Sequence, residues 1–204
     1  MIQNSPEWFA ARKGKITASR FGDVLANQKT KRYQQYQTEL VNELLGIPDF
    51  KDDEDKPWFQ HGKELEPKAR SWYEWEMIIK GNPDPVTEIG MIVHPSYDFI
   101  SCSPDGLHGH NKGIEIKSRI SHKEHLKSIK AEVPSNYKPQ VIGSLWVSGF
   151  EQWDFITFFE DPEGLIKSDI HITEVFPDPE YFERLEAACL SFWGEVQDKV
   201  NAHG

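Results

Sequence analysis

Two acidic side chains and one lysine lie on neighbouring apolar segments near the middle of the chain. Asp105 belongs to Ser103-Pro104-Asp105-Gly106-Leu107, and ten residues later the chain reads Glu115-Ile116-Lys117. Side chains alternate between the two faces of a strand, so we expect Glu115 and Lys117 on one face and Ile116 in the core. Carboxylates that converge from neighbouring strands can hold Mg²⁺, which prefers oxygen ligands and keeps several waters. The pattern predicts a metal site beside a lysine, an arrangement suited to phosphodiester hydrolysis.

The length of 204 residues suits a single domain with a substantial core. The two cysteines, Cys102 and Cys189, lie far apart, and we find no N-terminal signal pattern and no apolar run of membrane-spanning length. We therefore expect a soluble cytoplasmic protein with two buried, unpaired cysteines. Two thiols also exclude an iron–sulfur cluster with four cysteine ligands.

Charge is distributed unevenly along the chain, whose formal net charge is -10. Residues 1–36 carry seven Lys or Arg against Glu7 and Asp23, a balance of +5, and residues 117–138 give +4. Residues 151–204 hold thirteen acids and three bases, which equals the net charge of the whole chain. An acidic protein is at first a poor partner for DNA, but the basic segments that flank the predicted metal site in sequence remove this objection.

Helical spacing and strand-like runs succeed one another along the chain. Expected helices cover residues 5–11, 16–25, 33–45, 62–79, 123–131, 139–147 and 179–200, and a solvated acidic loop covers 49–56. Expected strands cover residues 86–93, 99–102, 113–120, 153–159 and 171–175. The fold class is α/β with a central mixed sheet flanked by helices. We expect one domain over 1–204, made of a basic helical part (1–80), a catalytic sheet with helices (86–176) and an acidic C-terminal helix (179–200).

Five short motifs occur in a fixed order. They are Trp8-Phe9-Ala10-Ala11-Arg12-Lys13-Gly14-Lys15-Ile16-Thr17-Ala18-Ser19, Gly62-Lys63-Glu64-Leu65-Glu66, Cys102-Ser103-Pro104-Asp105-Gly106-Leu107, Glu115-Ile116-Lys117 and Pro139-Gln140-Val141. Together they resemble the phage lambda exonuclease family, also called the YqaJ-type viral recombinases, of the PD-(D/E)xK nuclease superfamily. The resemblance runs from Trp8 to Phe159. It implies a restriction-endonuclease-like core and a Mg²⁺-dependent exonuclease, with Mn²⁺ as a substitute. Such an enzyme degrades one strand of linear duplex DNA from its 5′ end and leaves a 3′ strand for annealing.

The resemblance also assigns catalytic roles to residues of this chain. The metal ligands would be Asp105, Glu115, the backbone carbonyl of Ile116, and Glu66. Lys117 would orient or deprotonate the attacking water, and Gln140 would assist it from the other side. Lysine suits this role because its pKa falls readily beside cations and on desolvation.

A pocket for a 5′-phosphate is implied at Arg12, Ser19 and Ser103. A guanidinium can hold a terminal phosphate with two hydrogen bonds, and hydroxyl groups can satisfy the remaining oxygens. Phe59 stands where the family places an apolar wedge between base pairs, and an aromatic ring suits stacking on an unpaired base. His61 stands where a tryptophan is common in lambda exonuclease, so the chain departs from the family pattern in the residues expected to approach the DNA fork.

Each assignment has a structural alternative. Asp105-Gly106 also suits a plain turn, and Glu115 with Lys117 also suits a surface pair on an edge strand. Arg12 could be solvated, Ser19 and Ser103 could be local caps, and Phe59 could close a core edge beside Trp58. His108 and His110 are expected in a hairpin loop rather than at a metal, because convergent partners are missing from the sequence.

Two other functions remain open beside the exonuclease. One is an endonuclease of the same superfamily, against which the Arg12 and Ser19 pocket argues. The other is a DNA-end-binding or annealing protein without catalysis, which would have no need to concentrate carboxylates where phosphate must approach.

The resemblance further implies a homotrimeric ring around the DNA, a single-strand annealing protein as partner, and a bacterial host cytoplasm if the protein is phage-encoded. We expect the acidic tail to lie outside the channel of such a ring. The apolar residues of the last helix suit a subunit interface, a docking surface or the core of the domain, and the sequence does not separate these uses. They are Phe182, Leu185, Leu190, Phe192 and Trp193.

Overall fold

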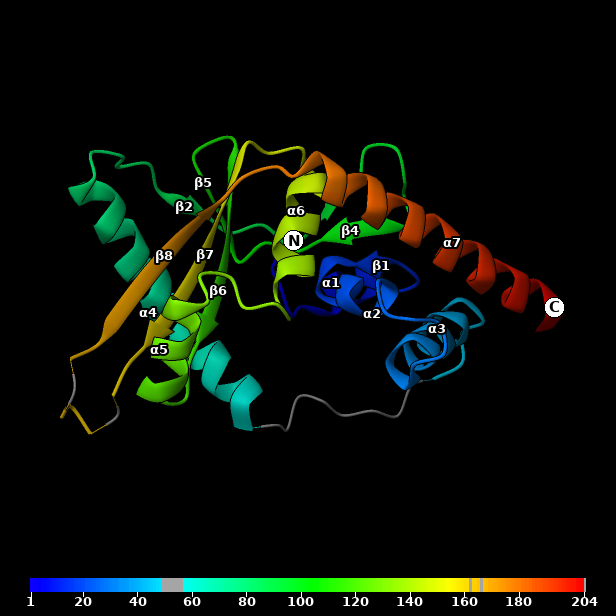
Figure 1. Cartoon of the computed structure of the whole chain (residues 1–204), viewed down its shortest axis with the longest axis horizontal. Coiled ribbons are helices and arrows are strands. Elements are labelled where there is room, and N and C mark those ends of the chain that lie inside the picture. Colours follow the sequence, from blue (N-terminus) through cyan, green and yellow to red (C-terminus); the bar gives the residue numbers. More distant parts are fainter. Residues whose placement is uncertain (49–56, 162, 166, 204) are drawn as a thin grey trace.

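The computed structural model describes residues 1–48, 57–161, 163–165 and 167–203 (Figure 1), and the side chains of 57–60 are outside this description. The elements of the N-terminal part are α1 (Pro6–Arg12), β1 (Ile16–Thr17), the 3-10 helix η1 (Ala18–Arg20), α2 (Phe21–Val24), α3 (Lys31–Leu44) and α4 (Pro57–Ile79). Then follow β2 (Val86–Thr87), β3 (Ile92–Val93), β4 (Ile100–Cys102), β5 (Gly106–His108), β6 (Lys112–Ser118), α5 (His122–Lys130), α6 (Lys138–Ser148), β7 (Gln152–Phe159), β8 (Asp169–Val175) and α7 (Pro179–His203).

Two sheets organise these elements. The larger has the order β2-β5-β6-β7-β8, and its β6 and β7 are parallel while the other neighbours are antiparallel. The smaller has the order β1-β4-β3, with β1 parallel to β4. Helix α4 packs on β6 and β8, and helices α5 and α6 pack on β7 (Figure 1). The predicted α/β fold with a mixed sheet flanked by helices is confirmed.

Three local predictions were wrong. Residues 86–93 form two short strands in different sheets, because the chain leaves the large sheet after Thr87 and is held at Gly90, whose carbonyl accepts a 2.7 Å hydrogen bond from Trp8 Nε1. Residues 16–17 begin no helix and form β1 instead, paired with β4. Residues 106–108 form β5, where a loop was expected. In each case pairing with another strand overrides the local pattern.

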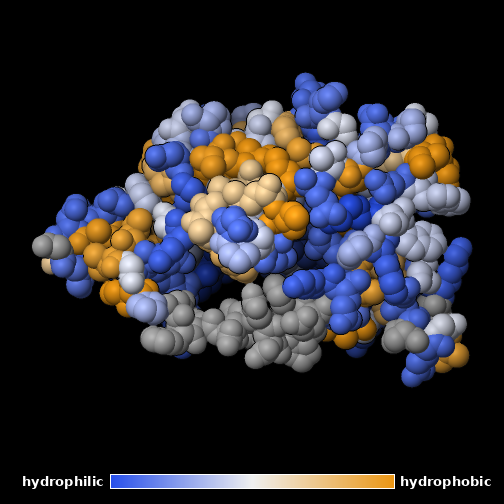
Figure 2. Space-filling model, turned by 180° about the vertical axis from the view of Figure 1, so that it is seen from behind, coloured by the Kyte–Doolittle hydropathy of each residue, from blue (hydrophilic) through white to orange (hydrophobic). Residues whose placement is uncertain are grey.

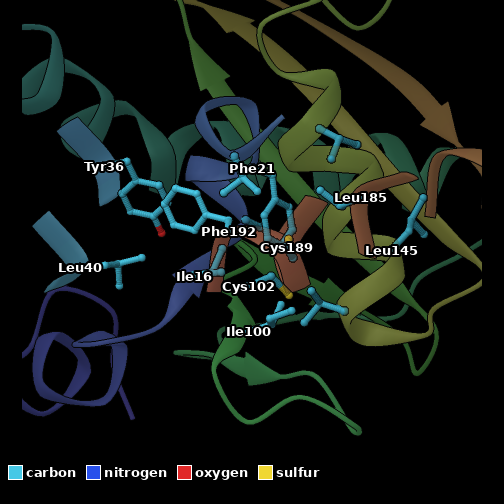
Figure 3. Packing of buried hydrophobic residues seen from close by; sticks show 14 of the residues in the cluster. Ile16, Phe21, Tyr36, Leu40, Ile100, Cys102, Leu145, Leu185, Cys189 and Phe192 are labelled. Atoms are coloured by element: carbon cyan, nitrogen blue, oxygen red, sulfur yellow. The ribbon is translucent and has the colours of Figure 1, made fainter. Parts of the chain in front are cut away.

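The core has two parts, one on each side of the large sheet. The first joins α2, α3, α6 and α7 to β4 and one face of β7; Figure 3 shows Phe192 of α7 against Tyr36 of α3, with ring centroids 5.3 Å apart. Cys102 and Cys189 are unpaired and buried in this part, as predicted. Leu185 and Phe192 are fully buried there, so these members of the last helix close the chain's own core. The second part packs α4 against β6 and β7.

Gly143 lets helix α6 approach the buried ring of Phe21. A Cβ at position 143 would lie 2.2 Å from Phe21 Cδ2, which is far inside van der Waals contact. Alanine normally favours a helix over glycine by about 1 kcal/mol, but overpacking a core costs about 1–3 kcal/mol. We expect Gly143→Ala to lower the melting temperature in thermal unfolding. Gly194→Ala in α7 is the control, because its Cβ meets nothing within 4 Å; a higher melting temperature is expected there, and a similar rise for Gly143→Ala would contradict the packing argument.

None of the helices in the described ranges combines sufficient length with the sustained apolar composition that a bilayer span requires. On the surface, Figure 2 shows hydrophobic side chains in separate patches among hydrophilic ones on the face opposite to that of Figure 1.

Candidate active site

Strand β6 presents Glu115 and Lys117 on one face. Ile114 and Ile116 pack with α4 in the core, whereas Glu115 faces helix α6 and is only 2% exposed. Glu115 Oε1 accepts a 2.6 Å hydrogen bond from Gln140 Nε2 and forms a 2.6 Å ion pair with Lys117 Nζ. The alternation predicted for Glu115, Ile116 and Lys117 is therefore confirmed, and Gln140 lies where it can act on the same carboxylate.

Asp105 lies directly before β5 and joins the two neighbouring strands. Its Oδ2 accepts a 2.6 Å hydrogen bond from the Ile116 backbone N–H, and its own N–H donates to Ile114 O at 3.0 Å. The preceding peptide is held as well, because Gln3 Nε2 donates to the Pro104 carbonyl at 2.6 Å. The Asp105 carboxylate is thus fixed beside the strand that carries Glu115 and Lys117, and a plain turn does not describe it.

Glu66 approaches from helix α4 and is held by an arginine that the sequence argument missed. Arg70 Nη2 donates to Glu66 Oε1 at 2.7 Å and to the Asp105 backbone carbonyl at 3.0 Å, and Nη1 pairs with Glu88 Oε1 at 2.5 Å. Arg70 therefore ties α4 to the loop of Asp105. Its spacing of four residues from Glu66 on one helix face is a signal that could have found it.

These side chains surround a cleft of about 870 Å³. Glu66, Asp105 and Lys117 line it, together with Arg119 and Tyr137. Lys63 and Lys127 contribute further positive charge from α4 and α5. The lining thus combines the carboxylates of Glu66 and Asp105 with several cationic groups, which is the charge arrangement that a phosphate-bearing chain and a cation could share.

Burial and mutual repulsion alter the protonation of the carboxylates. Burial, and then the charge of Asp105, raise the pKa of Glu66 to about 7. Burial, and then the charge of Glu115, raise the pKa of Asp105. Burial disfavours the charged form of Lys117, but the Glu115 and Asp105 carboxylates outweigh it and raise its pKa above the usual value. A neutral amine at Lys117 therefore requires additional positive charge nearby.

The phosphate-pocket residues are only partly brought together. Arg12, the last residue of α1, donates from Nη1 to Ser103 Oγ at 2.9 Å and stacks over the Trp8 ring at 4.2 Å. Trp8 Nε1 also lies 3.2 Å from Ser103 Oγ. Ser19, on η1, is exposed and contacts Thr17 Oγ1 at 3.3 Å. Burial lowers the pKa of Arg12, although it stays a cation at neutral pH.

The other residues named from the sequence are Phe59, His61, His108 and His110. Phe59 belongs to helix α4, but its side chain is outside the described ones, so its role as a wedge stays a prediction. His61 Nε2 lies 3.3 Å from the Arg119 carbonyl. His108 was expected in a loop but lies on β5, 3% exposed and edge-on to Tyr73, because β5 pairs on both sides. His110 is exposed in the turn that follows.

A divalent metal was expected here, and the donor types fit one. Within the described residues, no group of three or more His, Cys, Asp and Glu side chains is already arranged to hold a metal ion. However, Glu66, Asp105 and Glu115 offer the carboxylate oxygens that Mg²⁺ prefers, and their negative charges interact. The Lys117 ammonium is the cation that Glu115 holds in this structure. The chemistry of the site thus suits a hard cation.

A mixed sheet with carboxylates and a lysine on its central strands places the chain in the class of nuclease-like α/β folds. Residues 7–151 match the model of the YqaJ-like viral recombinase domain. Two solved structures of an alkaline exonuclease from Laribacter hongkongensis, one in complex with dAMP, are 32% identical to the chain. They have TM-scores of 0.82 and 0.81, and each comparison covers 97% of this chain and 95% of the other.

A phage-related exonuclease from Haemophilus somnus 129PT shares the fold, with a TM-score of 0.67, 15% identity and coverage of 93% of this chain and 96% of the other. No curated protein matches the chain. The family match spans well over half of the 204 residues. This chain belongs to the YqaJ-like viral recombinase family.

Proposed function

We propose that the protein is a Mg²⁺-dependent 5′-to-3′ exonuclease that degrades one strand of linear duplex DNA from a 5′-phosphorylated end. The family and its exonuclease relatives support a DNA exonuclease role. The observation that carries the proposal is the cluster of Asp105, Glu115 and Lys117, joined by Glu66 and Gln140. The 3′ strand would be left for recombination by annealing. A ring-shaped homotrimer and an annealing partner stay predictions from family resemblance.

Each residue of the site has a separate role in the proposed phosphodiester hydrolysis. Glu66, Asp105, Glu115 and the Ile116 carbonyl would hold Mg²⁺, which when bound polarises the phosphate, activates water and offsets the carboxylate charge around Lys117. Gln140 fixes Glu115 through its 2.6 Å hydrogen bond. Lys117 would orient the attacking water and take its proton. Arg70 keeps Glu66 and the Asp105 backbone in register.

The decisive experiment is digestion of linear duplex DNA labelled at either terminus, with and without Mg²⁺. We expect mononucleotides from the 5′ end, an intact complementary strand and intact covalently closed circles. Cleaved circles would favour the endonuclease of the same superfamily. Binding of DNA without hydrolysis at any metal concentration would leave the non-catalytic end-binding protein. Release from the 3′ end would contradict the polarity.

Arg12 supplies the test of the 5′-phosphate pocket. Its guanidinium lies 2.9 Å from Ser103 Oγ, two residues before Asp105. A hydrogen bond to a charged group contributes about 1.5–3 kcal/mol, so we expect the wild type to prefer a 5′-phosphate over a 5′-hydroxyl by about tenfold or more. Arg12→Gln should reduce this preference in initial rates on the two substrates. Arg32→Gln, which removes an exposed arginine from α3, is the control and should keep the preference. Equal preference in wild type and Arg12→Gln would exclude Arg12 from the pocket.

A further inference from the structure

Arg119 continues the functional face of β6 beyond the residues that the family resemblance assigns. It directly follows the strand, and its N–H donates to Phe158 O at 2.7 Å, while its carbonyl lies 3.3 Å from His61 Nε2. Its backbone is therefore held by β7 on one side and by α4 on the other. Because strand side chains alternate, Arg119 faces the same way as Glu115 and Lys117.

The side-chain contacts confirm that Lys117 and Arg119 share this face. The Tyr137 ring lies 5.2 Å from Lys117 Nζ and 5.1 Å from Arg119 Cζ, and all three residues line the cleft. Tyr137 precedes α6, the helix that carries Gln140. The two cations thus lie side by side against one aromatic ring, next to the proposed site of hydrolysis.

Among the described residues, the guanidinium of Arg119 is held only by neutral oxygens. Nε donates to Thr157 Oγ1 at 3.3 Å and Nη1 to the Tyr137 hydroxyl at 3.2 Å. Nη2 is buried and finds no hydrogen-bond partner among the described residues, and no acidic side chain in those ranges pairs with Arg119. Arg70, another half-buried arginine, has two carboxylate partners. Arg119 therefore keeps both its charge and spare donors for a ligand.

A chain of polar groups that begins in the buried interior and ends on half-exposed Asp169 fixes the orientation of Arg119. Thr157 Oγ1 also lies 3.3 Å from His125 Nδ1, and His125 Nε2 lies 3.0 Å from Asp169 Oδ2. Thr157 and His125 are 1% and 0% exposed. A side chain that is positioned in advance by such partners loses little freedom on binding. The contacts thus describe a built site for an anion, because a solvated surface arginine would have no such support.

We propose that Arg119 binds the backbone phosphate next to the one that is hydrolysed. The proposal rests on the proposed nuclease function and names a phosphate subsite of the same cleft. Alternate residues of a strand are roughly 6.6 Å apart, which is comparable to the spacing of successive phosphates along a DNA strand. With Lys117 at the scissile phosphate, Arg119 therefore lies at the adjacent phosphate of the same strand. The planar fork of a guanidinium matches two phosphate oxygens.

The test removes the charge of one phosphate at a time. A series of duplexes with a 5′-phosphate is prepared, and each duplex carries one neutral methylphosphonate at a different linkage near the 5′ end. Cleavage of the first linkage is then measured under single-turnover conditions with Mg²⁺. Equilibrium binding of the same duplexes is measured with Ca²⁺. In the wild type, a methylphosphonate beside the scissile linkage should slow cleavage and weaken binding by about tenfold or more. Arg119→Gln should lose about the same factor on all-phosphate DNA, and the same methylphosphonate should then add less than about twofold.

Two further variants keep the outcome decisive. Arg119→Lys retains the charge without the fork, so it should recover part of the loss and covers the case in which Arg119→Gln fails to fold. Lys80→Gln removes an exposed charge at the end of α4 and should match the wild type. Parallel methylphosphonate profiles for wild type and both Arg119 variants would overturn the proposal. If the wild type binds DNA but cleaves none, the nuclease function fails, and the binding profiles still decide whether Arg119 holds a phosphate.

Discussion

Lys117→Met should abolish DNA hydrolysis, with a loss of about 10²–10⁴-fold in the single-turnover rate. A positioned general base contributes a factor of this size, and methionine keeps the length of the side chain without its amine. Lys117 Nζ lies 2.6 Å from Glu115 Oε1, and both flank the Asp105 carboxylate that Ile116 N–H holds. Digestion of labelled duplex DNA measures the loss, and binding with Ca²⁺ tests whether the substrate still enters the cleft.

Lys117→Arg separates the role as a base from the role as a charge. Glu115 is 2% exposed, so removing its cationic partner leaves a buried carboxylate with only Gln140 and can destabilise the fold by about 3–5 kcal/mol. Arginine keeps the positive charge but does not deprotonate in proteins, so it cannot take a proton from water. We expect Lys117→Arg to melt near the wild type and to be as inactive as Lys117→Met. A rate within about tenfold of the wild type would assign Lys117 an electrostatic role only.

The sequence predicted the placement of the side chains on β6 better than the path of the chain around the strand. The period of two correctly separates Glu115 and Lys117 from Ile116. A strand side chain can point to only one of two faces, and the apolar side chain of Ile116 points into the core. The strand order, the second sheet and the split of residues 86–93 depend on partners far away in sequence, such as Trp8 on Gly90. No local pattern contains that information.

Arg70 and Arg119 show the same limit within the site. Both are charged residues of a kind that is usually solvated, and their importance arises from what the fold places around them. Arg70 donates to Glu66, Glu88 and the Asp105 carbonyl, whereas Arg119 donates only to Thr157 and Tyr137 among the described side chains. Arg70 has two acidic partners, which fits a positioning role, whereas Arg119 has none within the described ranges, which supports the binding role proposed for it. The four-residue spacing signals the contact of Arg70 with Glu66, but nothing in the sequence indicates that Arg119 Nη2 lacks a partner in the part of the chain that the structure describes.

Asp105→Asn should inactivate the enzyme and yet stabilise the metal-free protein. The asparagine oxygen can still accept the Ile116 N–H that Asp105 Oδ2 accepts at 2.6 Å, so the loop keeps its anchor. The variant loses the anionic ligand, and we expect hydrolysis to fall by about 10³-fold or more, in the range of a lost catalytic group. Burial and the Glu115 charge raise the pKa of Asp105 above its usual value of 3.8, so the folded state holds the proton more tightly than the unfolded state.

The sign of the stability change follows from this difference in proton binding. At pH values below the unfolded pKa, Asp105 is protonated in both states and costs the fold nothing. As pH rises through the window between the two pKa values, the unfolded state loses its proton first, so the folded state becomes less stable until the folded pKa is passed. In EDTA, Asp105→Asn should therefore melt with the wild type at pH 3 and at least about 2 °C above it at pH 8, a shift that corresponds to about 1 kcal/mol for a chain of this size.

Mg²⁺ should reverse this order, because a ligand that binds only the folded state stabilises it increasingly as the ligand concentration exceeds the dissociation constant. At pH 8, added Mg²⁺ is expected to raise the melting temperature of the wild type and to leave that of Asp105→Asn nearly unchanged. Glu88→Gln serves as the matched control, because this exposed carboxylate pairs with Arg70 outside the proposed ligands and its loss should keep the Mg²⁺ response. Equal Mg²⁺ responses in wild type and Asp105→Asn would remove Asp105 from the metal site. The carboxylates of this cleft thus lower the stability of the empty fold, and the cation they are proposed to bind restores it.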